Sequence, residues 1–268
     1  MLRINLAEVI TGINMNPLLA ISQITPTRTF NTLYVILDSI FIIAFVTLLF
    51  IKKRRITGIF ALLMGLLYII VDFGGFYLLS HTREIYIVIN GNKILQNEWN
   101  TLWVLTWMSL SYGITNGAFI WLALNKDKYT IHFSLAIFIW WICCPILSKA
   151  YPNSMEIITT RTTNEYHWIM AIFLVVGYGF IIVKDILTSK DIKSDVKKLL
   201  YLNLIGILAQ FGWEFALFVS GIRPANEMSL QTIIVNSLVE TNLGMPYFYY
   251  INKFIMNKRK EDLSKVNA

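Results

Sequence analysis

The chain has 268 residues, of which 56% are hydrophobic and 15% are charged, and its mean hydropathy is +0.58. A soluble domain is about 45–50% apolar and about 25% charged, so these values exclude an ordinary soluble protein and are typical of a polytopic membrane protein. The net charge of +7 does not indicate nucleic-acid binding, because the basic residues fall in short segments between apolar runs, where membrane topology places them.

The N-terminal segment precedes the first apolar run. Its first 30 residues include Glu8, Pro17 and Pro26 without a clean apolar core, so we expect no cleavable signal peptide. Two interpretations of residues 6–24 stay open: an interfacial or re-entrant helix on the outer face, or a disordered tail. We therefore divide the chain into an outer segment (1–30), a transmembrane domain (31–252) and a basic cytoplasmic tail (253–268) near anionic lipid headgroups.

Seven apolar runs are long enough to be transmembrane helices, since a helix needs about 20 residues to cross the hydrocarbon core. The fold expected from them is an all-α bundle of seven transmembrane helices. The predicted spans are Leu33–Ile51, Thr57–Ser80, Leu102–Leu124, Ile131–Leu147, Tyr166–Val183, Leu199–Ser220 and Leu230–Ile251.

The loop charges orient this bundle. Segments on one side of the seven spans carry 16 of the 23 Lys and Arg residues, and segments on the other side carry 7. Because cytoplasmic loops are enriched in Lys and Arg, the N-terminus is expected outside and the C-terminus in the cytoplasm. We thus expect a multi-pass protein of the cell membrane, with membrane lipids as neighbours and no nucleic-acid partner. The oligomeric state is not predicted.

Four acids lie inside predicted spans: Asp38, Asp72, Glu214 and Glu240. At a rise of about 1.5 Å per residue they lie about 8–15 Å from the outer ends of their spans, at comparable levels. Ionisable groups inside spans usually face the bundle interior or a cavity, so Glu214, Glu240 and Asp72 are candidate catalytic residues. Asp38 is expected to reach the outer headgroup region. No Lys or Arg lies within the spans, so we expect at least one acid to be held protonated.

Polar and aromatic side chains accompany these acids at helical spacings of three and four residues. They predict a hydrated cavity between spans two, three, six and seven that opens to the outside, although such residues can also serve only as hydrogen-bonding contacts between helices. The expected ligand is a lipidic or small polar molecule. The candidate ligand-binding residues are Tyr68, Ser109, Tyr112, Asn116, Gln210, Trp213 and Asn236.

No metal site or cofactor is expected. The three histidines lie at mixed depths and form no i, i+4 pair, and the adjacent Cys143 and Cys144 are interpreted as packing residues. Phosphate-binding loops, nucleophile elbows and zinc-protease helices are not found in the sequence.

Two segments resemble a known family. These are Phe211-Gly212-Trp213-Glu214-Phe215 and Asn236-Ser237-Leu238-Val239-Glu240-Thr241-Asn242-Leu243-Gly244-Met245-Pro246. They resemble seven-helix membrane-bound terpene cyclases. The resemblance implies that Glu214, with Glu240 as a second acid, protonates an isoprenoid epoxide or alkene, and that aromatic residues shelter the carbocation. Span two offers Val71-Asp72-Phe73 where that family has a Trp-Glu pair.

An alternative function is a transporter or receptor for a small solute or cation. Seven spans can be divided into three, a linker helix and three, the parallel-repeat plan of some transporters. Spans two and six then correspond, which aligns Asp72-Phe73 with Glu214-Phe215. A purely structural partner protein is a third possibility.

Overall fold

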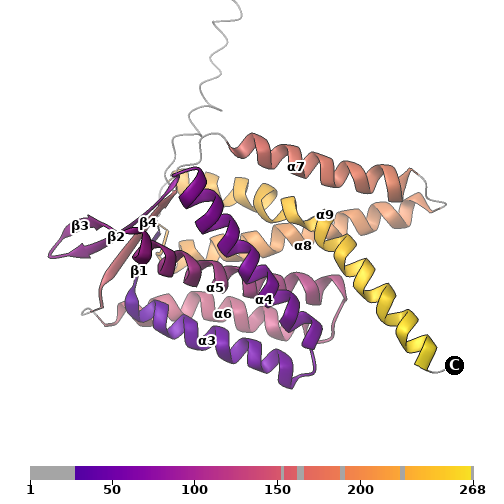
Figure 1. The fold of residues 1–268 in the computed structure, drawn as a ribbon, viewed down its shortest axis with the longest axis horizontal. Coiled ribbons are helices and arrows are strands. Elements are labelled where there is room, and N and C mark those ends of the chain that lie inside the picture. Colours follow the sequence, from indigo (N-terminus) through magenta and orange to yellow (C-terminus); the bar gives the residue numbers. More distant parts are fainter. Residues whose placement is uncertain (1–27, 152–153, 162–165, 188–190, 224–226, 267–268) are drawn as a thin grey trace, which may run out of the picture.

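The computed structural model is a helical bundle covered at one end by a small β-sheet (Figure 1). It describes residues 28–151, 154–161, 166–187, 191–223 and 227–266, so residues 6–24 lie outside the described part. The helices are α3 (Thr32–Ile51), α4 (Arg55–Ile69) continued by the π-helix η2 (Ile70–Leu79), α5 (Glu98–Leu124), α6 (Thr130–Lys149), α7 (Tyr166–Ile181) continued by the π-helix η3 (Ile182–Ile186), α8 (Ile192–Val219) and α9 (Glu227–Val266).

Each of the seven predicted spans falls on one of these helices. Four helices are long and apolar enough to cross a membrane, as judged by length and composition over the described residues: α3, α4 with η2, α6 and α8. The remaining predicted spans fall on α5, α7 with η3, and α9. The residues expected to form a C-terminal tail instead continue α9 as far as Val266.

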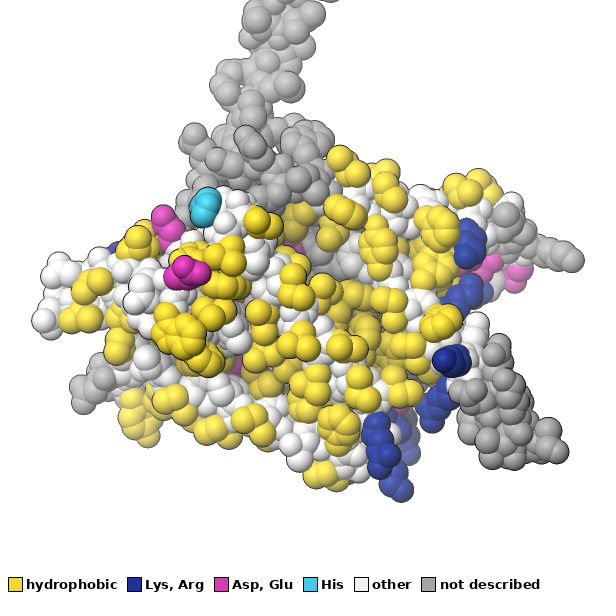
Figure 2. Space-filling model, in the orientation of Figure 1, with side chains coloured by type: hydrophobic (Ala, Val, Ile, Leu, Met, Phe, Trp, Pro, Cys, Tyr) yellow, Lys and Arg dark blue, Asp and Glu magenta, His cyan; other side chains and the backbone are white. Residues whose placement is uncertain are grey.

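The surface of the bundle is that of a membrane protein. Large apolar side chains such as Ile43, Leu63 and Val175 are 58–69% exposed, far more apolar surface than a soluble monomer tolerates. Figure 2 shows apolar side chains over the middle of the bundle, whereas Lys and Arg side chains gather at one end. That end includes the turn between α3 and α4, with the exposed Lys52 and Lys53, and the exposed Lys258 of α9.

The fold is mostly helical, as expected, but it is not all-α, because four strands of the described residues form an antiparallel sheet. The strands are β1 (Arg28–Asn31), β2 (Arg83–Ile89), β3 (Asn92–Leu95) and β4 (Glu156–Arg161), in the order β1-β4-β2-β3. The hairpin between β2 and β3 turns at Asn90 and Gly91, which both have positive φ (51° and 78°). Two such residues form the two-residue turn that best matches the twist of a hairpin.

The register of the sheet determines which side chains face the helices. Arg83 pairs with Arg161, and Arg28 pairs with Thr159, two residues before Arg161 on the same strand. Because side chains alternate between the faces of a strand, Arg28, Arg83 and Arg161 all point to the same face of the sheet. Ile85, which pairs with Thr159, belongs to that face and is fully buried. This face therefore lies against the helices and directs the three arginines into the bundle.

Two tightly packed helix pairs form the walls around the site. Between α4 and α5, a Cβ built on Gly113 would lie 2.8 Å from the Cα of Gly65. Between α8 and α9, a Cβ built on Gly206 would lie 2.1 Å from the Oδ1 of Asn242. Small residues of this kind let helices approach closely inside membranes. Helix α9 also contains Pro246 and bends along its length (Figure 1), as expected where proline interrupts the helical hydrogen bonds.

Candidate functional site

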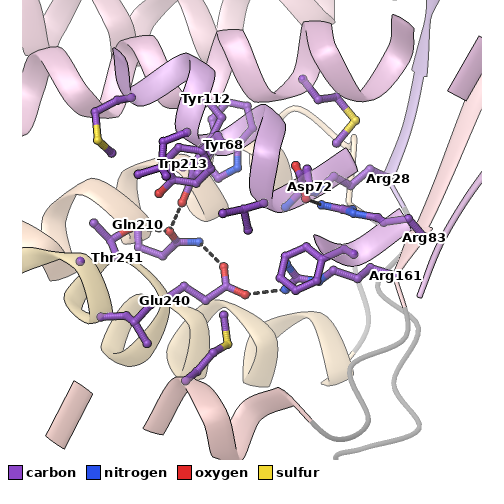
Figure 3. A pocket seen from close by; sticks show the side chains of 18 of the residues that line it. Arg28, Tyr68, Asp72, Arg83, Tyr112, Arg161, Gln210, Trp213, Glu240 and Thr241 are labelled. Atoms are coloured by element: carbon purple, nitrogen blue, oxygen red, sulfur yellow. Dashed lines mark hydrogen bonds and ion pairs between the residues drawn. The ribbon is translucent and has the colours of Figure 1, made fainter. Parts of the chain in front are cut away.

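A cavity of about 170 Å³ lies between the two helix pairs, beneath the sheet (Figure 3). Its polar end is formed by three arginines of the sheet together with Asp72 and Glu240. Apolar side chains form most of the rest of the wall, among them Leu67 of α4, Met108 of α5 and Phe248 of α9. The lining residues are Arg28, Met64, Leu67, Tyr68, Val71, Asp72, Phe76, Arg83, Met108, Tyr112, Arg161, Met170, Gln210, Trp213, Glu240, Thr241, Leu243, Gly244 and Phe248.

Asp72 lies on the π-helix η2, whose backbone hydrogen bonds span one residue more than those of an α-helix. Its Oδ1 accepts a hydrogen bond from Nη2 of Arg83 at 2.6 Å, and its Oδ2 accepts one from the Ser109 hydroxyl at 3.3 Å. The Ser109 hydroxyl also lies 3.3 Å from the backbone oxygen of Tyr68. Segments of π-helix frequently occur at functional sites, and here one presents a carboxylate to the cavity.

Glu240 faces the cavity from the opposite wall, on α9. It pairs with Arg161 of β4, whose guanidinium lies 5.4 Å from the ring of Phe76. The second carboxylate oxygen accepts a hydrogen bond from the side-chain amide of Gln210 at 3.1 Å. Figure 3 shows this pair and the Asp72–Arg83 pair as separate groups around the same space. The cavity thus has an ion pair on each of two walls.

Gln210 of α8 connects the polar groups into one network. Its side-chain oxygen accepts hydrogen bonds from the hydroxyls of Tyr112 and Thr241, and its amide nitrogen donates to Glu240 and, at 3.4 Å, to Glu214. The ring of Tyr112 packs edge-on against the ring of Tyr68, with 4.7 Å between centroids. A buried amide with both ends bonded fixes the positions of its neighbours.

Glu214 has a different environment from the other two acids. It is fully buried and is not among the residues that line the cavity. Nη2 of Arg223 lies 2.6 Å from its Oε2, and Nη2 of Arg28 lies 3.5 Å from its Oε1. The adjacent Trp213 lines the cavity and contacts the rings of Tyr112 and Trp141 at 5.2 and 4.7 Å between centroids. Glu214 thus lies behind the cavity wall, in contact with Gln210 and two arginines.

The expectation that the intramembrane acids have no basic partners is wrong for three of the four. Each of the three site carboxylates pairs with an arginine from outside the predicted spans, because the sheet and the turn after α8 direct these side chains inward. The expectation of a protonated acid rested on missing basic partners, and for these three carboxylates that premise does not hold. Sequence analysis missed four functional candidates: Arg28, Arg83, Arg161 and Arg223.

Two residues singled out from the sequence, Asn116 and Asp38, lie away from this cavity. Asn116 is buried on α5 and lines a separate apolar pocket against α6 and α8. The side chain of Asn236 lies outside the described residues. Asp38 is only 1% exposed and accepts a hydrogen bond from Nε1 of Trp140 at 3.1 Å, which contradicts the expectation that it reaches the headgroup region. It packs among aromatic side chains that link α3 to α6.

Positive charge exceeds negative charge at the site. Among the side chains that the structure describes, four arginines meet three carboxylates there. Burial lowers the pKa of Arg28, and the nearby charge of Arg223 lowers it further, against the opposing effect of Glu214. Arginine nevertheless stays protonated in proteins, so the excess charge persists. Within the described residues, no group of three or more His, Cys, Asp or Glu side chains could hold a metal ion.

Comparison with known proteins adds no relative: no family model, curated protein or solved structure matches the chain.

Proposed function

We propose that the chain is a seven-span protein of the cell membrane, with its N-terminus outside and its C-terminus in the cytoplasm. The correspondence between the seven predicted spans and the α-helices of the described residues, α3 to α9, supports the count. The exposed Lys and Arg side chains at one end of the bundle (Figure 2) support the orientation, because basic residues accumulate on the cytoplasmic side. In this arrangement the sheet covers the outer end and the cavity lies in the outer half of the membrane.

Its proposed function is to take a lipid-like amphiphile into this cavity as a substrate. The observation that carries the proposal is the division of one cavity into a charged end and an apolar wall. Arg28, Arg83 and Arg161 lie at one end, while Leu67 and Phe248 belong to the apolar part. A molecule with a polar head and a hydrocarbon chain matches both.

The size and position of the cavity favour a ligand that is only partly enclosed. Pockets that surround a drug-sized ligand measure about 300–1,000 Å³, so about 170 Å³ suffices for a headgroup and the first part of a chain. Leu67 and Val71 line the cavity and are also 44% and 40% exposed on the apolar surface of the bundle. The remainder of the chain can therefore stay in the lipid beside α4.

The carboxyl groups favour particular kinds of chemistry. Asp72 and Glu240 line the cavity, where a carboxyl group is suited to exchanging a proton with a substrate. Tyr68, Tyr112 and Trp213 add aromatic faces next to these groups. The resemblance to membrane-bound terpene cyclases, where a carbocation is sheltered by aromatic residues, supports an isoprenoid chain.

A transporter with a three-one-three arrangement of helices is the second candidate, and one observation favours it. Asp72 of α4–η2 and Glu214 of α8 each pair with an arginine a short distance along the chain, Arg83 and Arg223. Those two segments are the ones that a repeat would relate. The excess positive charge of the site, however, would repel a cation, so a cationic solute is disfavoured.

The test of the proposed function is the lipid content of the purified protein. Leu67→Trp fills the cavity from a lipid-facing position, whereas Leu66→Trp places the same bulk at a neighbouring residue that is 53% exposed and does not line the cavity. Wild type and Leu66→Trp should retain a common amphiphile near one molecule per chain, measured by mass spectrometry of organic extracts. Leu67→Trp should lose most of it. Equal amphiphile content in all three proteins would contradict the proposal.

A further inference from the structure

The polar end of the cavity contains one arginine whose charge is matched only loosely. Glu214 is held by Arg223 at 2.6 Å, while Arg28 lies 3.5 Å from the same carboxylate, beyond the usual length of a charge-assisted hydrogen bond. Asp72 and Glu240 have close partners of their own in Arg83 and Arg161. The guanidinium of Arg28 is thus the group that could bind a further anion with the least rearrangement.

Arg28 is also placed to reach a ligand. It lines the cavity, its side chain is 15% exposed compared with 2% for Arg223, and its guanidinium carbon lies 6.0 Å from the centre of the Trp213 ring. Arg83 and Arg161 line the same end of the cavity. Because the three arginines share one face of the sheet, their guanidinium groups converge on one space rather than spreading over a surface.

Net positive charge away from water is costly unless an anion compensates it. Guanidinium groups present planar pairs of N–H donors that fit the oxygens of phosphates and carboxylates, and phosphate oxygens offer more acceptors to several arginines at once. We propose that the headgroup bound in this cavity is a phosphate ester, that Arg28 is its principal ligand, and that Arg83 and Arg161 assist while they keep their pairs with Asp72 and Glu240. This inference rests on the proposed function, since the phosphate is taken to be carried by a lipid-like chain.

Three probes that share the farnesyl hydrocarbon group test the inference: farnesyl monophosphate, farnesol and farnesylamine. Inorganic phosphate is a fourth probe, which has no hydrocarbon group. Each is titrated into the purified full-length protein in a non-ionic detergent, and Kd is measured by microscale thermophoresis. Farnesyl monophosphate should bind at least tenfold more tightly than the alcohol or the amine, the difference expected from one charge-assisted hydrogen bond. Inorganic phosphate should bind much more weakly than farnesyl monophosphate.

Arg28→Gln is the decisive variant, because it removes the charge and leaves the closer Arg223–Glu214 pair in place. It should raise the Kd of farnesyl monophosphate about tenfold or more and leave the Kd of farnesol unchanged. Arg54→Gln removes a charge at the other end of the bundle, where Arg54 pairs with Asp127, and should change neither value.

The outcomes separate the two proposals. Binding of farnesol or farnesylamine as tight as that of the phosphate, or an unchanged phosphate Kd in Arg28→Gln, would overturn the inference and leave an amphiphile site standing. If none of the three farnesyl probes binds saturably, both the phosphate inference and the proposed amphiphile site are overturned. Inorganic phosphate that binds as tightly as farnesyl monophosphate would show an anion site without a lipid chain, and would also contradict the inference.

Discussion

Glu214 and Asp38 are both buried carboxyl groups inside helices, yet their partners differ. Glu214 is 0% exposed between Arg223 and Arg28, so it compensates buried positive charge. Asp38 accepts a hydrogen bond from the Trp140 indole and forms no ion pair within the described residues. Buried carboxyl groups at similar depth therefore have different energetic roles, and the difference comes from neighbours outside the helical segment that carries each acid.

Glutamine and asparagine substitutions should separate these roles. Glu214→Gln leaves two guanidinium groups without their carboxylate and should destabilise the protein by about 3–5 kcal/mol, because an uncompensated buried charge is costly. Asp38→Asn keeps a hydrogen-bond acceptor for Trp140 and should change stability by less than about 1 kcal/mol. Thermal unfolding in detergent measures both, and a Glu214→Gln protein as stable as wild type would contradict the assigned pairing.

The polar side chains around the site could be found from the sequence because they follow helical spacing. Gln210 and Glu214 are one turn apart and contact each other, as expected from the i, i+4 rule. The arginines could not be found in this way, since Arg83 and Arg161 reach the acids only through strand pairing. Their loops did contain a signal: the alternating Ile85, Ile87 and Ile89 before Asn90-Gly91 is the pattern of a hairpin.

Among the elements, the sheet and the π-helix position the charged groups. Register fixes three arginines on one face, and η2 presents Asp72 toward them. The Gly74-Gly75 pair lies inside η2, and a Cβ on either residue would meet nothing within 4 Å, so these glycines are not required for packing. By contrast, Gly113 lies against the backbone of α4, where a Cβ would come within 2.9 Å of the backbone oxygen of Met64.

Gly113→Ala should therefore separate α4 from α5 and destabilise the protein by about 1–3 kcal/mol, the usual cost of overpacking. The backbone of α4 cannot rotate away as a side chain would. Gly75→Ala is the matched control on the same helix pair and should cause no loss of stability. Thermal unfolding of the two variants in the same detergent checks this, and equal stability would show that α4 and α5 are not packed so closely.

At the scale of the whole molecule, the helices follow directly from hydropathy, because runs such as Leu33–Ile51 must satisfy their backbone hydrogen bonds internally in a membrane. The segments between them do not. Residues 83–95 and 156–161 were expected to be loops, but they pair with β1 to cover the site. Strand pairing between distant segments depends on how the helices pack. It therefore cannot be predicted from a single sequence, whereas a transmembrane span can be predicted from hydropathy.

The central claim is that this cavity holds an amphiphile by its headgroup. The most direct test is an electron cryo-microscopy structure of the full-length protein in nanodiscs made with lipids from its own host membrane. The account predicts elongated non-protein density that begins beside Arg28, Arg83 and Arg161 and leaves the protein next to Leu67 and Val71. A cavity without such density, or one closed by Arg28 in a direct pair with Glu240, would contradict it.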